Sequence, residues 1–286
     1  MLLRLMSHNV WNRDTNTPEW EKLGYDCSAK VRVKGILRVY EETMPDVVGM
    51  QEMTNLMVDY IKEDFSQKGK KYAVIWGRFT PIMYNSDKLE LIDTEFGSYP
   101  EKIENWEGEF NDVKSKTWNL AVFRVKENGK IFAFATTHLW WMRNPTTEAD
   151  VNKHGYQPLS NEAREWQIKL LISKLKTYSQ KYKCPMVLTG DFNTSYNSKP
   201  IKYALNDGFI HAHNLATDYV DETMGYHYCF CDGFKSEYYD KPFEDAIDHI
   251  LVKDAPSNAV KRFERYSPDY YYPISDHSPV FIDIEI

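Results

Sequence analysis

Short apolar runs that each end in a polar motif recur along the whole chain, and they limit the folds that it can adopt. The last motif, Ser275-Asp276-His277-Ser278-Pro279, stands directly before the apolar segment 280–286. Four similar motifs occur earlier, each at the end of a strand-like run. Side chains at the end of a buried strand lie on the rim of its sheet. The pattern therefore predicts strands whose rim carries carboxylate, amide and imidazole groups.

Helical segments alternate with these strands. Apolar residues at helical spacing in 33–44 predict one helix, which Pro45 ends, and those in 168–178 predict a long amphipathic helix from near Asn161. No linker, repeat or low-complexity tract divides residues 1–286, which predicts a single domain. Because strands and helices alternate in both halves, we expect an α/β sandwich with the sheets inside. The other predicted elements are a helix over 55–65 and strands over 3–10, 46–52, 72–76, 81–84, 89–96, 118–125, 131–137, 185–189, 246–252 and 279–286.

The composition is typical of a globular protein without a membrane span. Hydrophobic residues make up 42% and charged residues 27% of the 286 residues. No run approaches the roughly 20 apolar residues of a membrane helix, so we expect no transmembrane segment. The apolar start of the chain is too short for a secretory signal peptide and runs into a polar motif, which indicates a first strand and a cytoplasmic protein. A signal peptide removed before this sequence begins stays an open alternative.

The cysteines and the net charge narrow the function classes. Cys27, Cys184, Cys229 and Cys231 form no C-x-x-C pair, so neither a zinc site nor a disulfide framework is indicated. The net charge of −7 argues against tight, sequence-independent binding to a nucleic-acid backbone, which depends on clusters of lysine and arginine. We therefore expect a small or single-stranded substrate in preference to duplex DNA.

One pair of residues offers oxygen ligands for a cation. Glu52 follows the apolar run 47–50, and Asn9 ends the first predicted strand. A hard divalent cation such as Mg²⁺ prefers oxygen ligands and needs only one or two carboxylates. The alternative for a lone glutamate is a solvated strand end.

The motif Gly190-Asp191-Phe192-Asn193 is the most specific local signal. Gly190 permits a tight turn after the run 185–189, and Asp191 and Asn193 then reach the same side of an extended segment. A carboxylate that deprotonates water and an amide that holds it would form a nucleophile site. An Asx turn is the alternative explanation of the same residues.

Histidines and further aspartates complete the candidate set. His138 follows the predicted strand 131–137 and could donate to a phosphate oxygen, although a lone histidine there is more often structural. Asp248 follows apolar residues and needs a partner if it is buried. We predict that this partner is His277 and not that His277 pairs with the adjacent Asp276, because neighbours on a strand point to opposite faces.

Six motifs along the chain together resemble one known family. They are Ser7-His8-Asn9-Val10, residues 45–52, Thr137-His138-Leu139, Gly190-Asp191-Phe192-Asn193, Ile247-Asp248-His249-Ile250 and residues 275–280. They occur in the order found in the endonuclease/exonuclease/phosphatase superfamily, and they span nearly the whole chain. The resemblance implies a four-layer α/β/β/α sandwich, in which two mostly antiparallel sheets pack face to face with the active site at one edge.

The resemblance also implies roles in binding metal and water. Glu52 and Asn9 would bind Mg²⁺ or Mn²⁺, with Asp276 close to this metal or to a second cation. Asp191 would activate the attacking water, and Asn193 would position it.

The remaining implied roles concern the phosphate. His277 would contact the scissile phosphate with Asp248 as its orienting carboxylate, and His138 would be a second phosphate-binding histidine. We expect divalent-metal-dependent hydrolysis of a phosphodiester or phosphomonoester by in-line attack of activated water. A nuclease acting on DNA or RNA and a non-catalytic module that binds a phosphate ligand are the alternatives.

Three further segments bear on the substrate. Tyr226-His227 resembles a Thr-Phe-His segment of the deadenylase-like branch, although His249 stands where that branch often has tyrosine. The stretch 140–160 looks long for this branch and contains Trp140-Trp141, which would either form a stacking platform for a base or sugar or pack the insertion. Tyr270-Tyr271-Tyr272 leaves the same two alternatives open.

Overall fold

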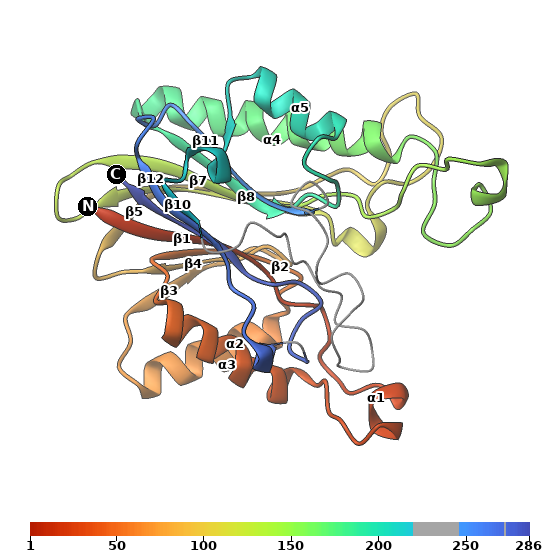
Figure 1. The fold of residues 1–286 in the computed structure, drawn as a ribbon, viewed down its shortest axis with the longest axis horizontal. Coiled ribbons are helices and arrows are strands. Elements are labelled where there is room, and N and C mark those ends of the chain that lie inside the picture. The colour runs from red at the N-terminus through yellow and green to blue at the C-terminus, as the bar shows by residue number, and fades with distance from the viewer. Residues whose placement is uncertain (220–245, 272) are drawn as a thin grey trace.

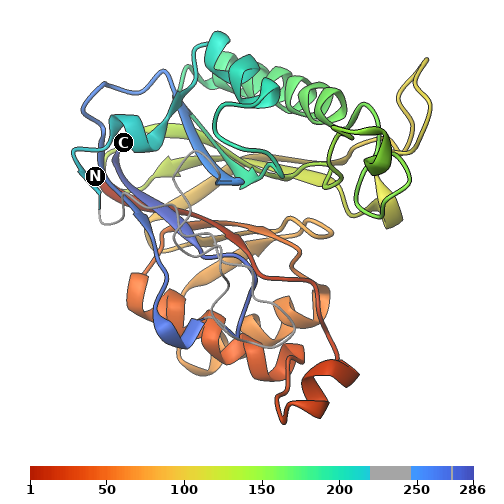
Figure 2. The ribbon, with the colours of Figure 1, turned by 45° about the vertical axis from the view of Figure 1, so that its right-hand side comes forward.

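Two β-sheets pack face to face, with helices on both outer faces (Figures 1 and 2). The computed structural model describes residues 1–219, 246–271 and 273–286. In this part of the chain the first sheet has the strand order β10 (Asp218–Tyr219), β12 (Val260–Arg265), β13 (Val280–Glu285), β1 (Leu2–Asn9), β2 (Val47–Gln51), β4 (Ile82–Asn85), β3 (Tyr72–Ile75). The second has the order β5 (Leu89–Ser98), β6 (Thr117–Val125), β7 (Ile131–His138), β8 (Met186–Asp191), β11 (Asp248–Lys253), β9 (Ile210–His211).

Helices cover the outer face of each sheet. α2 (Ala29–Thr43) and α3 (Asn55–Gln67) lie on the first sheet, and α4 (Ser160–Tyr182) and α5 (Lys199–Asn206) lie on the second (Figure 1). Two shorter helices are α1 (Pro18–Lys22) and α6 (Ala212–Leu215). Most described strand pairs are antiparallel, while β1–β2, β7–β8 and β10–β12 are parallel. The predicted α/β/β/α sandwich is therefore confirmed.

Alternation along the strands produces three apolar layers. On β7, Phe132 and Phe134 pack into the layer between the sheets, whereas Ala133 and Ala135 pack under α4. On β1, Leu5 faces the layer between the sheets and Met6 faces α2 and α3. Because side chains of a strand alternate between its faces, both faces of these central strands are buried.

The helices follow their predicted patterns closely. α2 ends where Met44 adopts a left-handed conformation with φ 49°, directly before Pro45. α4 is the longest helix in the described part of the chain and buries Ile168, Leu171 and Leu175 against the second sheet. No helix of the described residues combines the length and the apolar composition that crossing a membrane requires.

The described structure also differs from the prediction. The unpredicted elements are α1, α5, α6, β9, β10 and β12. β12 was not predicted, because Val260-Lys-Arg-Phe-Glu-Arg265 is rich in charge and lies near the edge of its sheet. Residues 275–279 form bends and loop before β13 and not a strand. Asp276 and His277 therefore lie in a loop, which sets their positions, and the alternation of side chains along a strand does not separate them. Tyr226-His227, Cys229, Cys231 and Tyr272 lie outside the described residues.

Candidate active site

Strand register brings three predicted residues together at the rim of the second sheet. β7 and β8 run parallel with His138 opposite Asp191, and β8 and β11 run antiparallel with Asp191 opposite Asp248. Gly190 makes this register possible, because a Cβ at its φ of +149° would lie 2.1 Å from the carbonyl oxygen of Thr137. Asp191 is 1% and Asp248 4% exposed.

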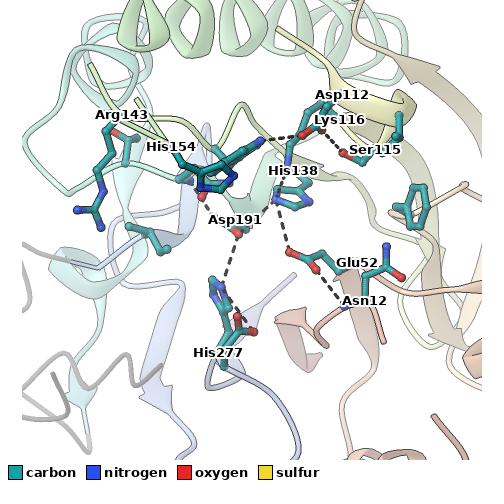
Figure 3. Close-up of a pocket in the computed structure, with 18 of the residues that line it drawn as sticks. Asn12, Glu52, Asp112, Ser115, Lys116, His138, Arg143, His154, Asp191 and His277 are labelled. Carbon is teal, nitrogen blue, oxygen red and sulfur yellow. Dashed lines mark hydrogen bonds and ion pairs between the residues drawn. The ribbon is translucent and has the colours of Figure 1, made fainter. Parts of the chain in front are cut away.

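The first sheet contributes Asn9 and Glu52. β1 and β2 run parallel with Asn9 opposite Gln51, and Glu52 follows in a left-handed conformation with φ 59°. This conformation is uncommon for glutamate and carries backbone strain, which concentrates at functional sites. The amide Nδ2 of Asn9 donates to Asp191 Oδ2 at 2.9 Å and lies 3.3 Å from Glu52 Oε1. The ends of both sheets therefore meet in one site (Figure 3).

The amide of Asn9 has a definite orientation. Its Oδ1 accepts a hydrogen bond from the backbone N–H of Trp11 at 3.1 Å, so its nitrogen and not its oxygen faces the two carboxylates. Binding a metal through Asn9 would require the amide to turn about its Cβ–Cγ bond.

His277 and Asp248 form a buried ion pair. Nδ1 of His277 donates to Asp248 Oδ2 at 2.7 Å, so the predicted contact is present, and Nε2 points toward Asp191 Oδ2 at 3.8 Å (Figure 3). Burial alone would lower the pKa of His277, but the charges of Asp248, Asp276 and Asp191 raise it well above its usual value of 6.5. Burial would raise the pKa of Asp248, but His277 outweighs it and the pKa is lowered. The pair is therefore an imidazolium bound to a carboxylate.

Two other carboxylates of the site are harder to ionise. Burial raises the pKa of Asp191 to about 7, against the opposing charge of His277. Burial also raises the pKa of Asp276 to about 6, although 24% of its side chain is exposed and water offsets part of this effect. Asp276 Oδ1 lies 4.0 Å from His277 Nε2 and has no hydrogen-bond partner among the described residues.

Asn193 is held next to Asp191. Its backbone N–H donates to Asp191 Oδ1 at 2.8 Å, which is the Asx-type contact that the sequence left open. Its φ is 51°, and its side-chain Nδ2 donates to the carbonyl of Leu139 at 3.1 Å. Asn193 also lines the cavity in front of Asp191.

Sequence reasoning missed Lys116. This lysine is 3% exposed and its Nζ lies 2.8 Å from His138 Nε2, while no carboxylate of the described residues lies within 4.0 Å of it. Burial lowers the pKa of Lys116, and burial together with the Lys116 charge lowers the pKa of His138 well below 6.5. His138 is therefore neutral and accepts from the ammonium. No local motif marks Lys116, because it stands in a loop whose position depends on β6 and β7.

A second missed residue, Arg32 of α2, holds the loops around Asn9. It is fully buried and donates to five backbone carbonyls at 2.7 Å, those of Val10, Trp11, Arg13, Cys27 and Ile274. These carbonyls belong to the segment after β1 and to the loop that carries His277. Arg32 therefore positions both segments without entering the cavity.

A cavity of about 790 Å³ opens at this site (Figure 3). The site residues that line it are Glu52, Lys116, His138, Asp191, Asn193, Asp276 and His277. Trp141, Arg143 and His154, from the stretch 140–160, form part of its wall. Trp140 is 2% exposed and packs against Phe110, so only Trp141 of the two tryptophans reaches the cavity. Tyr271 is fully buried and its hydroxyl bonds His8, so it packs the core under the site.

The donor set fits a hard divalent cation. Ligand atoms of Glu52, His138 and Asp191 lie within 4.8 Å of one another, and the buried Oδ1 of Asp276 is unpaired within the described structure. The carboxylate oxygens that line this cavity suit Mg²⁺ or Mn²⁺, which prefer oxygen ligands, whereas His138 Nε2 already accepts from Lys116.

Comparison with known proteins assigns the chain to a family. A model of the endonuclease/exonuclease/phosphatase family matches residues 6–277. The Drosophila melanogaster protein angel is 28% identical over 184 residues, which cover 60% of this chain and 46% of that protein.

Solved structures show the same fold. An endonuclease/exonuclease/phosphatase family protein from Bacteroides thetaiotaomicron aligns with a TM-score of 0.73 at 19% identity, covering 99% of this chain and 95% of its own. A mannosyl-6-phosphatase from the same species aligns with a TM-score of 0.71 at 20% identity, covering 99% and 100%. The chain belongs to the endonuclease/exonuclease/phosphatase family.

Proposed function

We propose that this protein is a divalent-metal-dependent phosphoesterase that hydrolyses a small or single-stranded phosphodiester or phosphomonoester. The observation that carries this proposal is the convergence of Glu52, Asp191, His138 and His277 on one cavity, with His277 held by the buried Asp248. We also propose that residues 1–286 act as one catalytic domain, because both sheets supply residues to that cavity.

Each group has a distinct task in this mechanism. Glu52, with Asp276 and a turned Asn9, would hold Mg²⁺ or Mn²⁺, which polarises the phosphate and stabilises developing charge. Asp191 takes a proton from the attacking water, and its pKa of about 7 suits proton transfer near neutral pH. Asn193, which lines the cavity beside Asp191, orients that water.

Two cationic groups and one neutral imidazole would stabilise the negative charge of the phosphate. His277 donates from Nε2 to a phosphate oxygen while Asp248 holds its tautomer and charge at Nδ1. Lys116 and the neutral His138 add a buried ammonium and an imidazole next to Asp191. Donors fixed in a water-poor site stabilise charge that builds up in the transition state.

The test is hydrolysis of bis-p-nitrophenyl phosphate, p-nitrophenyl phosphate and short oligonucleotides with Mg²⁺ or Mn²⁺. We expect activity that EDTA abolishes and that added metal restores. Activity that persists in EDTA would contradict the metal-dependent mechanism. Binding of phosphate without any hydrolysis would favour the alternative of a non-catalytic module.

A further inference from the structure

The proposed mechanism gives no role to the wall of the cavity that Trp141, Arg143 and His154 form. Trp141 follows β7 three residues after His138 and lines the same cavity as Asp191 and His277. In contrast to Trp140, its indole is not part of the buried core. An aromatic face beside a phosphate site is suited to contact the organic group that the phosphate carries.

The backbone on both sides of Trp141 is fixed by α4. Arg164 is 3% exposed, and its Nη1 donates to the carbonyl of Trp140 at 2.9 Å and to the carbonyl of Met142 at 2.6 Å. The backbone N–H of Trp140 donates to Gln167 Oε1 at 2.9 Å. Two buried side chains of one helix therefore hold backbone groups of Trp140 and Met142, the two neighbours of Trp141 in the chain.

The indole ring itself is also fixed. Its Nε1–H donates to Asp112 Oδ2 at 2.8 Å, and Asp112 Oδ1 accepts from Ser115 Oγ at 2.9 Å. The indole N–H thus already has a hydrogen-bond acceptor in the protein, so a ligand would contact the apolar surface of the ring. An aromatic group that is rigid before binding contributes more affinity than one that must be ordered.

The loop beyond Trp141 closes the cavity on this side. Arg143 N–H donates to the carbonyl of Gly155 at 2.8 Å, and Gln157 N–H donates to the carbonyl of Arg143 at 2.9 Å, which joins the two ends of the loop. The His154 ring lies 5.6 Å from the Trp141 ring, and Figure 3 shows Arg143 across the cavity from Glu52. The cavity of about 790 Å³ is of a size that takes one small ligand.

We propose that Trp141, with Arg143 and His154 at its border, forms a leaving-group subsite for a phosphorylated sugar ring, free or within a nucleotide. This inference rests on the proposed phosphoesterase function. The indole would stack on the apolar face of the ring, while Asp112, Arg143 and His154 offer hydrogen-bond partners to its hydroxyl groups. Phosphate esters without a ring would bind through the phosphate alone.

Isothermal titration calorimetry with Mg²⁺ and the Asp191→Asn protein, which blocks turnover, tests this subsite. The probes are glucose 6-phosphate, adenosine 5′-monophosphate, glycerol 3-phosphate and inorganic phosphate. We expect a ring phosphate to bind about tenfold more tightly than glycerol 3-phosphate, within the range of aromatic stacking. Trp141→Ala in the same background should remove this preference and leave the affinity for inorganic phosphate unchanged, whereas Trp141→Phe should keep part of it.

Trp76→Ala is the matched control, because Trp76 is 61% exposed and lines no part of this cavity. It should keep the full preference. A preference for only one of the two ring phosphates identifies the source of the sugar and supports the subsite. Equal affinities for all organic phosphates, or a preference that survives Trp141→Ala, would overturn the subsite but not the phosphoesterase. If neither inorganic phosphate nor any organic phosphate binds and no phosphate ester is hydrolysed, the proposed function fails and the subsite fails with it.

Discussion

Replacing Asp248 with asparagine should disable His277 while leaving the fold intact. Both side chains are buried, and the 2.7 Å contact between Nδ1 and Oδ2 joins an imidazolium to a carboxylate. Asparagine still offers an oxygen to Nδ1–H but removes the charge that raises the pKa of His277. Positioned proton donors contribute roughly 10²- to 10⁴-fold to rate. We therefore expect kcat to fall by about that factor, which corresponds to about 3 to 5 kcal/mol of activation free energy.

The direction of the pH effect follows from the same pair. The raised pKa keeps His277 protonated at neutral pH, so activity should decline only as the pH rises above that value. In Asp248→Asn the pKa falls, and the alkaline limb of the kcat profile should move to lower pH. Histidine NMR titration and p-nitrophenyl ester hydrolysis measure both quantities.

Asp283→Asn is the matched control for this experiment. Asp283 accepts from Arg4 Nε at 2.7 Å on β13 and lies outside the cavity. Its replacement also removes the carboxylate of an ion pair, here the pair with Arg4, but it should leave kcat and the pKa of His277 unchanged. A normal kcat in Asp248→Asn together with an unshifted His277 pKa would refute the reasoning.

Three further substitutions separate activity from stability. Lys116→Met should lower kcat/KM by about 10²-fold, as loss of one transition-state donor does. It should not lower the free energy of unfolding in urea, because burial of the ammonium is itself unfavourable. A large loss of stability would contradict this. Arg32→Lys should lower the free energy of unfolding by about 3 kcal/mol, since several buried carbonyls lose their donor, whereas Arg38→Lys on the exposed side of α2 should change it by less than about 0.5 kcal/mol. Burial lowers the pKa of His211 to about 3, so the folded state binds fewer protons than the unfolded state and stability is lost as the pH falls below 6.5. His211→Phe, which can keep the stacking on Tyr196, should therefore gain about 2 kcal/mol relative to wild type between pH 7.5 and pH 5; parallel pH curves for the two proteins would argue against it.

Much of the site was predictable because its residues follow strands. Glu52, His138 and Asp191 each come directly after or at the end of an apolar run, and strand register alone then places His138 beside Asp191 and Asp191 beside Asp248. The order of these motifs along the chain also indicated the sandwich. Local sequence was sufficient here because the end of a strand is a position that hydrophobic patterning marks.

Other features depend on contacts between distant segments. Lys116 becomes a site residue only because β6 and β7 pair and bring it to His138. Which of Trp140 and Trp141 faces the cavity is decided by Arg164 and Gln167 of α4. The positions of Lys116, Trp140 and Trp141 depend on contacts between distant segments, and no spacing of residues in the sequence predicts them.

The central claim is that Asp191 activates water for metal-dependent hydrolysis in this cavity. The most direct measurement is the hydrolysis rate of bis-p-nitrophenyl phosphate by wild type and Asp191→Ala, each at saturating Mg²⁺ or Mn²⁺, with circular dichroism to confirm folding. We predict a loss of at least about 10²-fold in kcat for the folded variant. A folded Asp191→Ala protein with the wild-type rate would contradict the account.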